Sequence, residues 1–72
     1  MKFKPGCIYF QRCAGFWVVW QATYYDGRIM LGTVLVTNNP LLRQSWYGAP
    51  HETHREISEE ELMMYRLQGE GT

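Results

Sequence analysis

The chain has 72 residues, with seven lysines and arginines against seven aspartates and glutamates, and a formal net charge of zero. A chain of this length forms one domain, and it removes only about 60% of its unfolded surface from water, so its hydrophobic core is small. The zero net charge argues against binding that is driven simply by the phosphates of a nucleic acid.

The charges are distributed unevenly along the chain. Residues 1–50 carry five basic residues against a single Asp26, whereas residues 51–72 carry two arginines against six glutamates. Such asymmetry indicates either electrostatic steering toward a partner or a mixed, solvated surface.

The two cysteines, Cys7 and Cys13, are expected to be free thiols. If both lie on one extended strand, their α-carbons are about 20 Å apart, which is far beyond disulfide reach. Free thiols are typical of a reducing cytosol. The start of the chain lacks the apolar core of a signal peptide, and the longest apolar runs are much shorter than the ~20 residues of a membrane span, so we expect a soluble protein.

The first expected strand covers residues 7–12 and follows a turn at Lys4-Pro5-Gly6. Residues 13–15 form a short hairpin loop in which Gly15 is available for a positive φ. The second strand, residues 16–24, is dense in aromatic and β-branched side chains, which suit a half-buried sheet.

Asp26-Gly27 predicts a two-residue type I′ turn that leads into a third strand over residues 28–36. This turn places Tyr25 opposite Arg28 and Trp20 opposite Thr33, and so sorts the side chains onto two faces. The face expected to form the core carries Phe16, Val18, Trp20, Ala22, Tyr24, Ile29, Leu31, Thr33 and Leu35.

The opposite face is too apolar for a plain solvent face. Either the sheet curls into a small barrel that buries part of both sides, or this face holds a contact surface. The residues of that surface would be Trp17, Tyr25, Arg28 and Met30.

The rest of the chain predicts shorter elements. Residues 37–40 form a turn by composition, residues 41–47 indicate a weak fourth strand, and residues 54–57 indicate a short edge strand. The fold class is therefore α+β and mainly β: a small antiparallel sheet or a partly open SH3-like barrel of three to five strands, with one short C-terminal helix.

Ser58 to Glu61 form a capping box, in which the Ser58 hydroxyl accepts from the amide of Glu61 and the Glu61 carboxylate reaches back. Ile57 and Leu62 supply the accompanying hydrophobic staple, so a helix begins at Glu59. Residues 63–67 either continue this helix or form a closing strand. We expect a single domain over residues 1–68 and a flexible tail over residues 69–72.

No catalytic or metal-binding pattern is visible in the sequence. His51 and His54 lack the spacing of a zinc-protease helix, and the spacings of Cys7, Cys13, His51 and His54 fit no common zinc module. Neither a nucleophile with its base nor a glycine-rich phosphate loop can be identified. We therefore expect no enzymatic activity, no cofactor and no metal.

The composition favours binding. Three tryptophans and five tyrosines, with arginines beside them, are residue types enriched at the energetic centres of interfaces. We expect a monomer that binds a partner through the residues Lys2, Lys4, Arg12, Trp17, Tyr25, Arg28 and Arg43.

The layout of the chain resembles that of a family of small proteins. The resemblance rests on the Lys4-Pro5-Gly6 start, on the aromatic hairpin of residues 15–20 closed by Asp26-Gly27, and on the acidic segment of residues 58–62. The family is that of the phage-encoded transcription regulators that bind host bacterial RNA polymerase, of the type found in a Xanthomonas phage. The resemblance covers the whole length but assigns no site residue position by position.

This resemblance implies a protein of the host bacterial cytoplasm that docks on the largest polymerase subunits. It would inhibit transcription initiation and promote antitermination, with accessory transcription factors or nascent nucleic acid as further partners. Two alternatives stay open: an inhibitor of another host defence, of the anti-CRISPR or anti-restriction kind, and a small barrel that binds nucleic acid by stacking bases on Trp17 or Tyr25.

Overall fold

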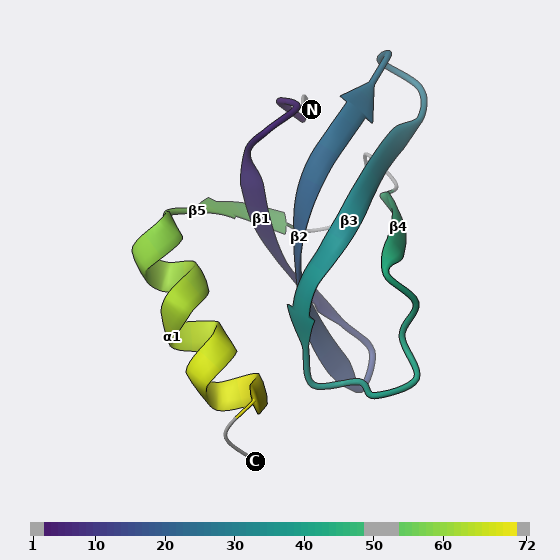
Figure 1. Cartoon of the computed structure of the whole chain (residues 1–72). Helices are drawn as coiled ribbons and strands as arrows, with labels where there is room; N and C mark the ends of the chain where they lie inside the picture. The colour runs from purple at the N-terminus through teal and green to yellow at the C-terminus, as the bar shows by residue number, and fades with distance from the viewer. Residues whose placement is uncertain (1–2, 49–53, 71–72) are drawn as a thin grey trace.

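The computed structural model describes residues 3–48 and 54–70 of the chain. In chain order its elements are β1 (Ile8–Cys13), β2 (Phe16–Tyr25), β3 (Met30–Thr37), β4 (Ser45–Gly48), β5 (His54–Ile57) and α1 (Glu59–Glu70). The five strands form one open antiparallel sheet in the order β4-β3-β2-β1-β5, and α1 lies alongside it (Figure 1). The predicted fold class, a small and mainly β domain with one C-terminal helix, is confirmed.

The hairpin between β1 and β2 is as tight as the sequence predicts. Cys13 and Phe16 are the closing pair, so only Ala14 and Gly15 lie in the loop. Gly15 has a φ of 86°, which is the left-handed conformation that favours glycine. Neither Cys7 nor Cys13 forms a disulfide, as expected.

The hairpin between β2 and β3 differs from the expectation of a two-residue turn. Tyr25 pairs with Met30 and not with Arg28, so four residues form the loop. A type I′ turn needs a positive φ at both central positions, but in the described residues only glycines have one, and Asp26 does not. Instead, the Asp26 carboxylate accepts hydrogen bonds from the backbone amides of Arg28 and Ile29, at 2.9 and 2.8 Å.

The predicted division of the two faces is wrong along β3 as well as at the tip of this hairpin: Thr33, expected in the core, is exposed, and Leu35 packs against the hydrophobic cluster on the opposite face. Tyr24 and Ile29, expected in the core, are 48% and 52% exposed, while Met30, expected on a contact surface, is fully buried. The wider loop moves the register by two residues and the irregularity between Ala22 and Tyr24 moves it back by one, so that Trp20 pairs with Val34 and not with Thr33. A bulge of one residue reverses the alternation of side chains, so the periodicity of the sequence alone could not predict on which face of the sheet these side chains lie.

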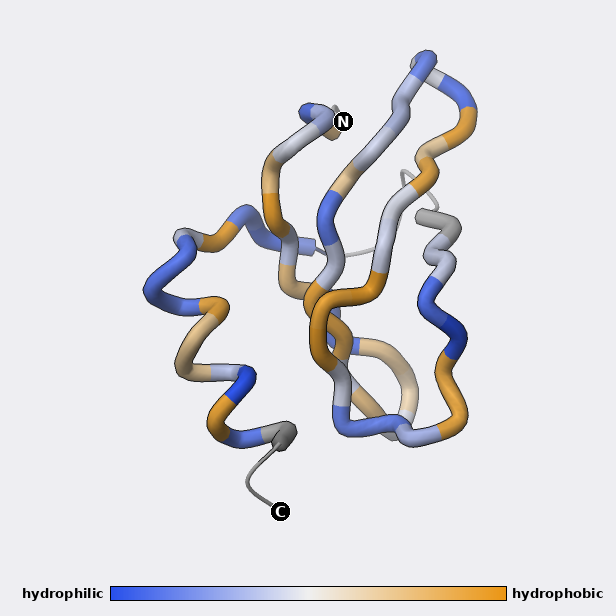
Figure 2. The backbone as a smooth tube through the Cα atoms, in the orientation of Figure 1, coloured by the Kyte–Doolittle hydropathy of each residue, from blue (hydrophilic) through white to orange (hydrophobic). Residues whose placement is uncertain are grey.

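Both faces of β2 are buried, each by a different hydrophobic cluster. The first cluster consists of Phe3, Tyr9, Val18, Trp20, Ala22 and Met30, with Phe16, Tyr25, Val34, Leu42 and Trp46 among the half-buried residues around it. The second consists of Val19, Val36, Ile57 and Leu62, with Ile8, Phe10, Trp17, Leu35 and Tyr65 packed against it. Figure 2 shows apolar backbone positions along the central strands and along the helix. The helix thus covers one side of the open sheet, and this accounts for the apolar character of the second face.

The start of α1 follows the predicted capping box in part. The Ser58 hydroxyl accepts a hydrogen bond from the Glu61 amide at 3.2 Å, and Ile57 and Leu62 are both buried in the second cluster. The Glu61 carboxylate, however, binds Arg55. Residues 63–67 continue the helix, which reaches Glu70 and so includes the first two residues of the expected tail. In the described residues, no helix has the length and apolar character needed to cross a membrane.

Candidate functional site

Arg12 and Trp17 lie opposite each other on β1 and β2. They are partners in the antiparallel register, because the loop at Ala14 and Gly15 is only two residues long. Directly opposed residues share one face of a sheet, with their β-carbons about 5 Å apart. The structure thereby brings together one basic and one aromatic residue of the predicted binding set. Arg12 is exposed and Trp17 is half-buried.

Trp17 belongs to a group of three rings on the helix-covered side of the sheet. The Phe10 ring stacks on Tyr65 of α1 with 4.8 Å between centroids, and on Trp17 at 6.2 Å. Trp17 and Tyr65 are themselves 5.3 Å apart, at an angle of 49°. Ring contacts of this geometry contribute stability in addition to that from the burial of apolar area, so the three rings form an ordered aromatic platform.

Arg55 of β5 lies at the edge of this platform. It pairs with Phe10 in the strand register, and its guanidinium carbon is 5.8 Å from the centre of the Phe10 ring. One guanidinium nitrogen donates to the Glu61 carboxylate at 2.8 Å and the other to the Tyr65 hydroxyl at 3.3 Å. The hydrogen bond with Glu61 and the charge of its carboxylate raise the pKa of Arg55.

We call Phe10, Arg12, Trp17, Arg55 and Tyr65 the aromatic-basic patch. A surface hollow of about 310 Å³ lies beside it and is lined by Phe10, Arg12, His54 and Arg55. The charge of Arg55 is offset by Glu61, whereas Arg12 forms no ion pair with any residue of the described ranges. Arg12 is therefore the charge of the patch that is available to a partner.

The backbone of Trp17 is fixed by the end of β3. The Thr37 hydroxyl donates a hydrogen bond to the Trp17 carbonyl at 2.6 Å and accepts one from the Asn39 amide at 3.1 Å. The turn predicted over residues 37–40 thus holds one edge of the patch in place.

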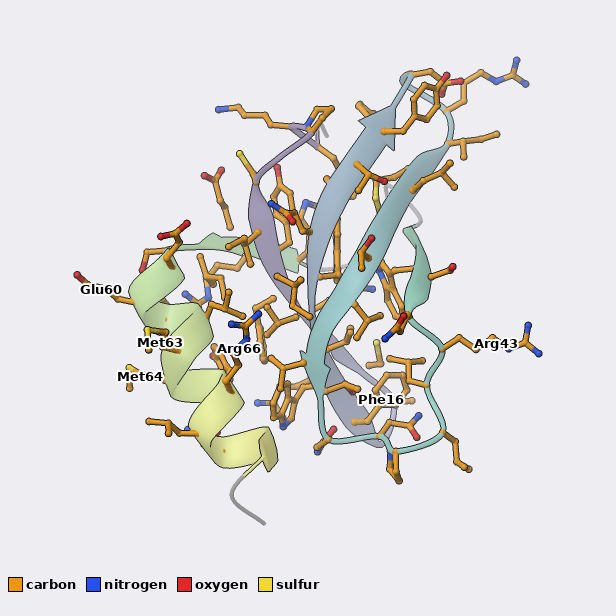
Figure 3. The ribbon with its side chains drawn as sticks, in the orientation of Figure 1. Phe16, Arg43, Glu60, Met63, Met64 and Arg66 are labelled. Carbon is orange, nitrogen blue, oxygen red and sulfur yellow. The ribbon has the colours of Figure 1, made fainter. Side chains whose placement is uncertain are left out.

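The other predicted binding residues lie elsewhere. Tyr25 is half-buried in the first cluster, where its ring meets Phe3 edge-on at 5.4 Å. Arg28 is exposed at the tip of the β2–β3 hairpin, and Lys4 is exposed before β1. Arg43 projects on the β4 side of the molecule, away from α1 (Figure 3). Lys2 lies outside the described residues.

Three members of the patch were not among the predicted residues: Phe10, Arg55 and Tyr65. The alternation of side chains in β1 places Phe10 on the same face as Arg12, which the sequence could have indicated. Arg55 and Tyr65 join the patch only through the pairing of β5 with β1 and the position of α1. No local sequence pattern predicts either arrangement.

The described residues hold no group of three or more histidine, cysteine, aspartate or glutamate side chains that could bind a metal ion. Of the two histidines considered in the sequence, His54 packs its ring against Phe3, with centroids 4.3 Å apart. His51 lies outside the described residues.

Comparison with known proteins gives no match: no protein-family model, no curated protein and no solved structure is similar to this chain.

Proposed function

We propose that this protein is a non-enzymatic regulator that acts in the bacterial host cytoplasm by binding RNA polymerase through the aromatic-basic patch. Bound in this way, it inhibits transcription initiation and promotes antitermination. The choice of polymerase as partner is supported by the resemblance of the sequence layout to phage-encoded polymerase-binding regulators. The choice of surface is supported by the residue types that the aromatic-basic patch brings together.

The observation that carries the proposal is the register pairing of Arg12 with Trp17, whose ring packs with the rings of Phe10 and Tyr65. Tryptophan, tyrosine and arginine are enriched among the residues that dominate the binding energy of protein interfaces. The rigid rings of tryptophan and tyrosine bury large areas and lose little side-chain entropy. Side chains that are already ordered in the free protein lose less conformational entropy on binding than those of a flexible loop.

The charges around the patch favour a protein partner over a nucleic acid. The patch holds two arginines, and Glu61 offsets one of them. Glu59 and Glu60 are exposed in the same turn of α1 as Glu61. Phosphate-driven binding gains from each neutralised phosphate, and such a surface offers few cations for it. A polar protein surface with a carboxylate opposite Arg12 matches these charges.

The test is a binding measurement between purified bacterial RNA polymerase and the full chain. We expect Arg12→Glu to weaken binding by at least about tenfold, which corresponds to ~1.4 kcal/mol. Arg28→Glu makes the same charge change at an exposed arginine outside the patch, and we expect it to bind within about twofold of the unchanged chain.

Two results would overturn this proposal. If polymerase does not retain the unchanged chain, the partner is wrong. If Arg28→Glu weakens binding as strongly as Arg12→Glu, the surface is wrong. Binding to single-stranded nucleic acid that falls steeply with salt, without binding to polymerase, would support a nucleic-acid module in its place.

A further inference from the structure

Helix α1 is apolar on two opposite sides. Leu62 is 7% exposed and faces the sheet, where the Tyr65 ring also packs. On the other side, Met63, Met64 and Leu67 are 64%, 61% and 76% exposed. Figure 3 shows Met63 and Met64 projecting away from the sheet. The fold of the chain therefore accounts for only one of the two apolar sides.

The exposed apolar residues of α1 form one continuous stripe. Residues three and four apart on a helix are surface neighbours, so Met63 and Met64 both adjoin Leu67. Single apolar residues on a surface are ordinary, but three large exposed ones at neighbouring helix positions are typical of an interaction site. Methionine side chains are flexible and polarisable, and they adapt to the shape of a bound surface. We call Met63, Met64 and Leu67 the helix stripe.

The charges next to the helix stripe indicate which kind of partner can bind there. The first turn of α1 carries Glu59, Glu60 and Glu61, and its last turn carries no basic residue. Glu61 is paired with Arg55, whereas Glu59 and Glu60 are exposed and form no ion pair within the described residues. Glu60 precedes Met63 by three positions and Met64 by four, so it borders the stripe directly.

The remaining basic residue of the helix, Arg66, is not on the stripe. It points toward the sheet (Figure 3) and lines a groove of about 390 Å³ between α1 and the sheet. Met63 also lines this groove, so it forms the edge of the helix stripe nearest the sheet. A second copy docked stripe to stripe would therefore bring glutamates and apolar side chains, and no cation opposite Glu60. Like charges at an interface oppose association, so a partner of opposite charge is favoured.

We propose that the helix stripe binds an amphipathic helix of a partner protein, with an apolar face against Met63, Met64 and Leu67 and lysine or arginine opposite Glu60. Apolar residues at helical spacing are the anchors of this recognition mode, and flanking charges set its specificity. This second surface lies on the outer side of α1, opposite in charge to the aromatic-basic patch, and it does not depend on the function proposed above.

The test uses the full chain and two designed helical peptides of identical apolar face. One peptide carries lysine at the flanking positions and the other carries glutamate. Binding is measured by NMR of the methionine methyl groups and by fluorescence titration of labelled peptide. We expect the lysine peptide to bind at least about tenfold more tightly than the glutamate peptide at low salt, and to shift the Met63 and Met64 signals first.

Substitutions in the chain locate the binding. Met64→Gln with Leu67→Gln should weaken lysine-peptide binding by at least about tenfold, because these exposed side chains supply the apolar contact. Leu41→Gln changes another exposed leucine, 89% accessible, in the loop before β4, and should have no effect. Arg12→Glu should also leave peptide binding unchanged, which separates this proposal from the one on polymerase.

The proposal is overturned if neither peptide binds, if the two bind equally, or if the Met64 and Leu67 substitutions change nothing. It is also overturned if sedimentation shows that the chain self-associates and that the same two substitutions abolish the association. In that case a second copy is the occupant of the helix stripe.

Discussion

The amide of Trp17 donates a hydrogen bond to the side-chain oxygen of Asn38, at 2.9 Å and across 21 positions of the chain. The Thr37 hydroxyl binds the carbonyl of the same tryptophan. Both backbone polar groups of Trp17 are therefore held by Thr37, the last residue of β3, and by Asn38, which follows it.

The first prediction concerns Thr37. Thr37→Val keeps the shape of the side chain but removes a hydroxyl that donates to Trp17 and accepts from Asn39. We expect it to lower the free energy of unfolding by about 1 kcal/mol, with a range of ~0.5–1.5. The amide resonances of Trp17 and Asn39 should shift in the same variant. Urea denaturation and NMR measure the two effects.

The control for Thr37 is Thr33→Val, which removes an exposed hydroxyl from the same strand. It should change stability by less than about 0.5 kcal/mol. Equal losses from both threonines would mean that the general cost of valine in β3, and not the bond to Trp17, causes the effect.

Most elements of the fold were predictable because local signals in the sequence agree with one another. The β-branched and aromatic residues of 16–25 favour a strand, and Gly15 permits the tight loop before it. Ser58 and the three glutamates after it mark the helix start, where the structure places it. Each of these signals acts over a few neighbouring residues, so it needs no knowledge of tertiary contacts.

The register of β2 against β3 was not predictable in this way. Asp-Gly favours a type I′ turn, but the Asp26 carboxylate accepts hydrogen bonds from two backbone amides in a wider loop, and Tyr25 pairs with Met30. The irregularity between Ala22 and Tyr24 moves the register back by one residue, which places Tyr25 and Met30 on the same buried side as Trp20. Burial of Met30 and Tyr25 beside Phe3 is a long-range gain, which the local turn preference could not reveal.

The second prediction concerns ionisation at this hairpin tip. Hydrogen bonds from the amides of Ile29 and Arg28 lower the pKa of Asp26, and the Asp26 charge, with the hydrogen bond at 3.2 Å, raises the pKa of Tyr24. We expect Asp26→Asn to return the Tyr24 pKa toward its ordinary value of about 10. NMR titration of the Tyr24 ring carbons measures this. An unchanged Tyr24 pKa would show that the two side chains do not interact in solution.

The lowered pKa of Asp26 also determines how the stability of the chain changes with pH. The folded state favours the charged carboxylate, so its contribution is present above the unfolded pKa of about 3.9 and is lost as the pH falls through the lower, folded value. The chain should therefore lose more stability between pH 5 and pH 2 than Asp26→Asn does. Urea midpoints at several pH values provide the comparison.

The third prediction concerns the helix start. Ser58→Ala removes the acceptor for the Glu61 amide and should cost about 1 kcal/mol, within a range of ~0.5–2. Ser45→Ala, at an exposed position of β4, serves as the matched control and should have little effect. Because α1 covers the second hydrophobic cluster, the loss should appear in global unfolding and not only in helix content. An unaffected urea midpoint would mean that Ile57 and Leu62 hold the helix without the cap.

The candidate site was only partly predictable, for a reason that concerns topology. Arg12 and Trp17 come from one hairpin, whose two-residue loop fixes their pairing. Arg55 and Tyr65 reach the same surface from β5 and α1, more than 40 positions along the chain from Arg12. Composition indicates which residue types bind, but only the strand order places β5 beside β1.

The last prediction concerns Gly32, which pairs with Ala22 in the sheet. A β-carbon at this position would lie 2.8 Å from the backbone oxygen of Gln21 and 3.1 Å from the Trp20 ring. Trp20 is fully buried and cannot move aside, so the strands themselves must shift. We expect Gly32→Ala to lower the free energy of unfolding by about 1–3 kcal/mol, although alanine restricts the unfolded chain and would by itself add ~0.4–1 kcal/mol. Urea denaturation measures the difference, with Thr33→Ala as the neighbouring exposed control. A gain in stability would show that β2 and β3 lie farther apart at Gly32 than described.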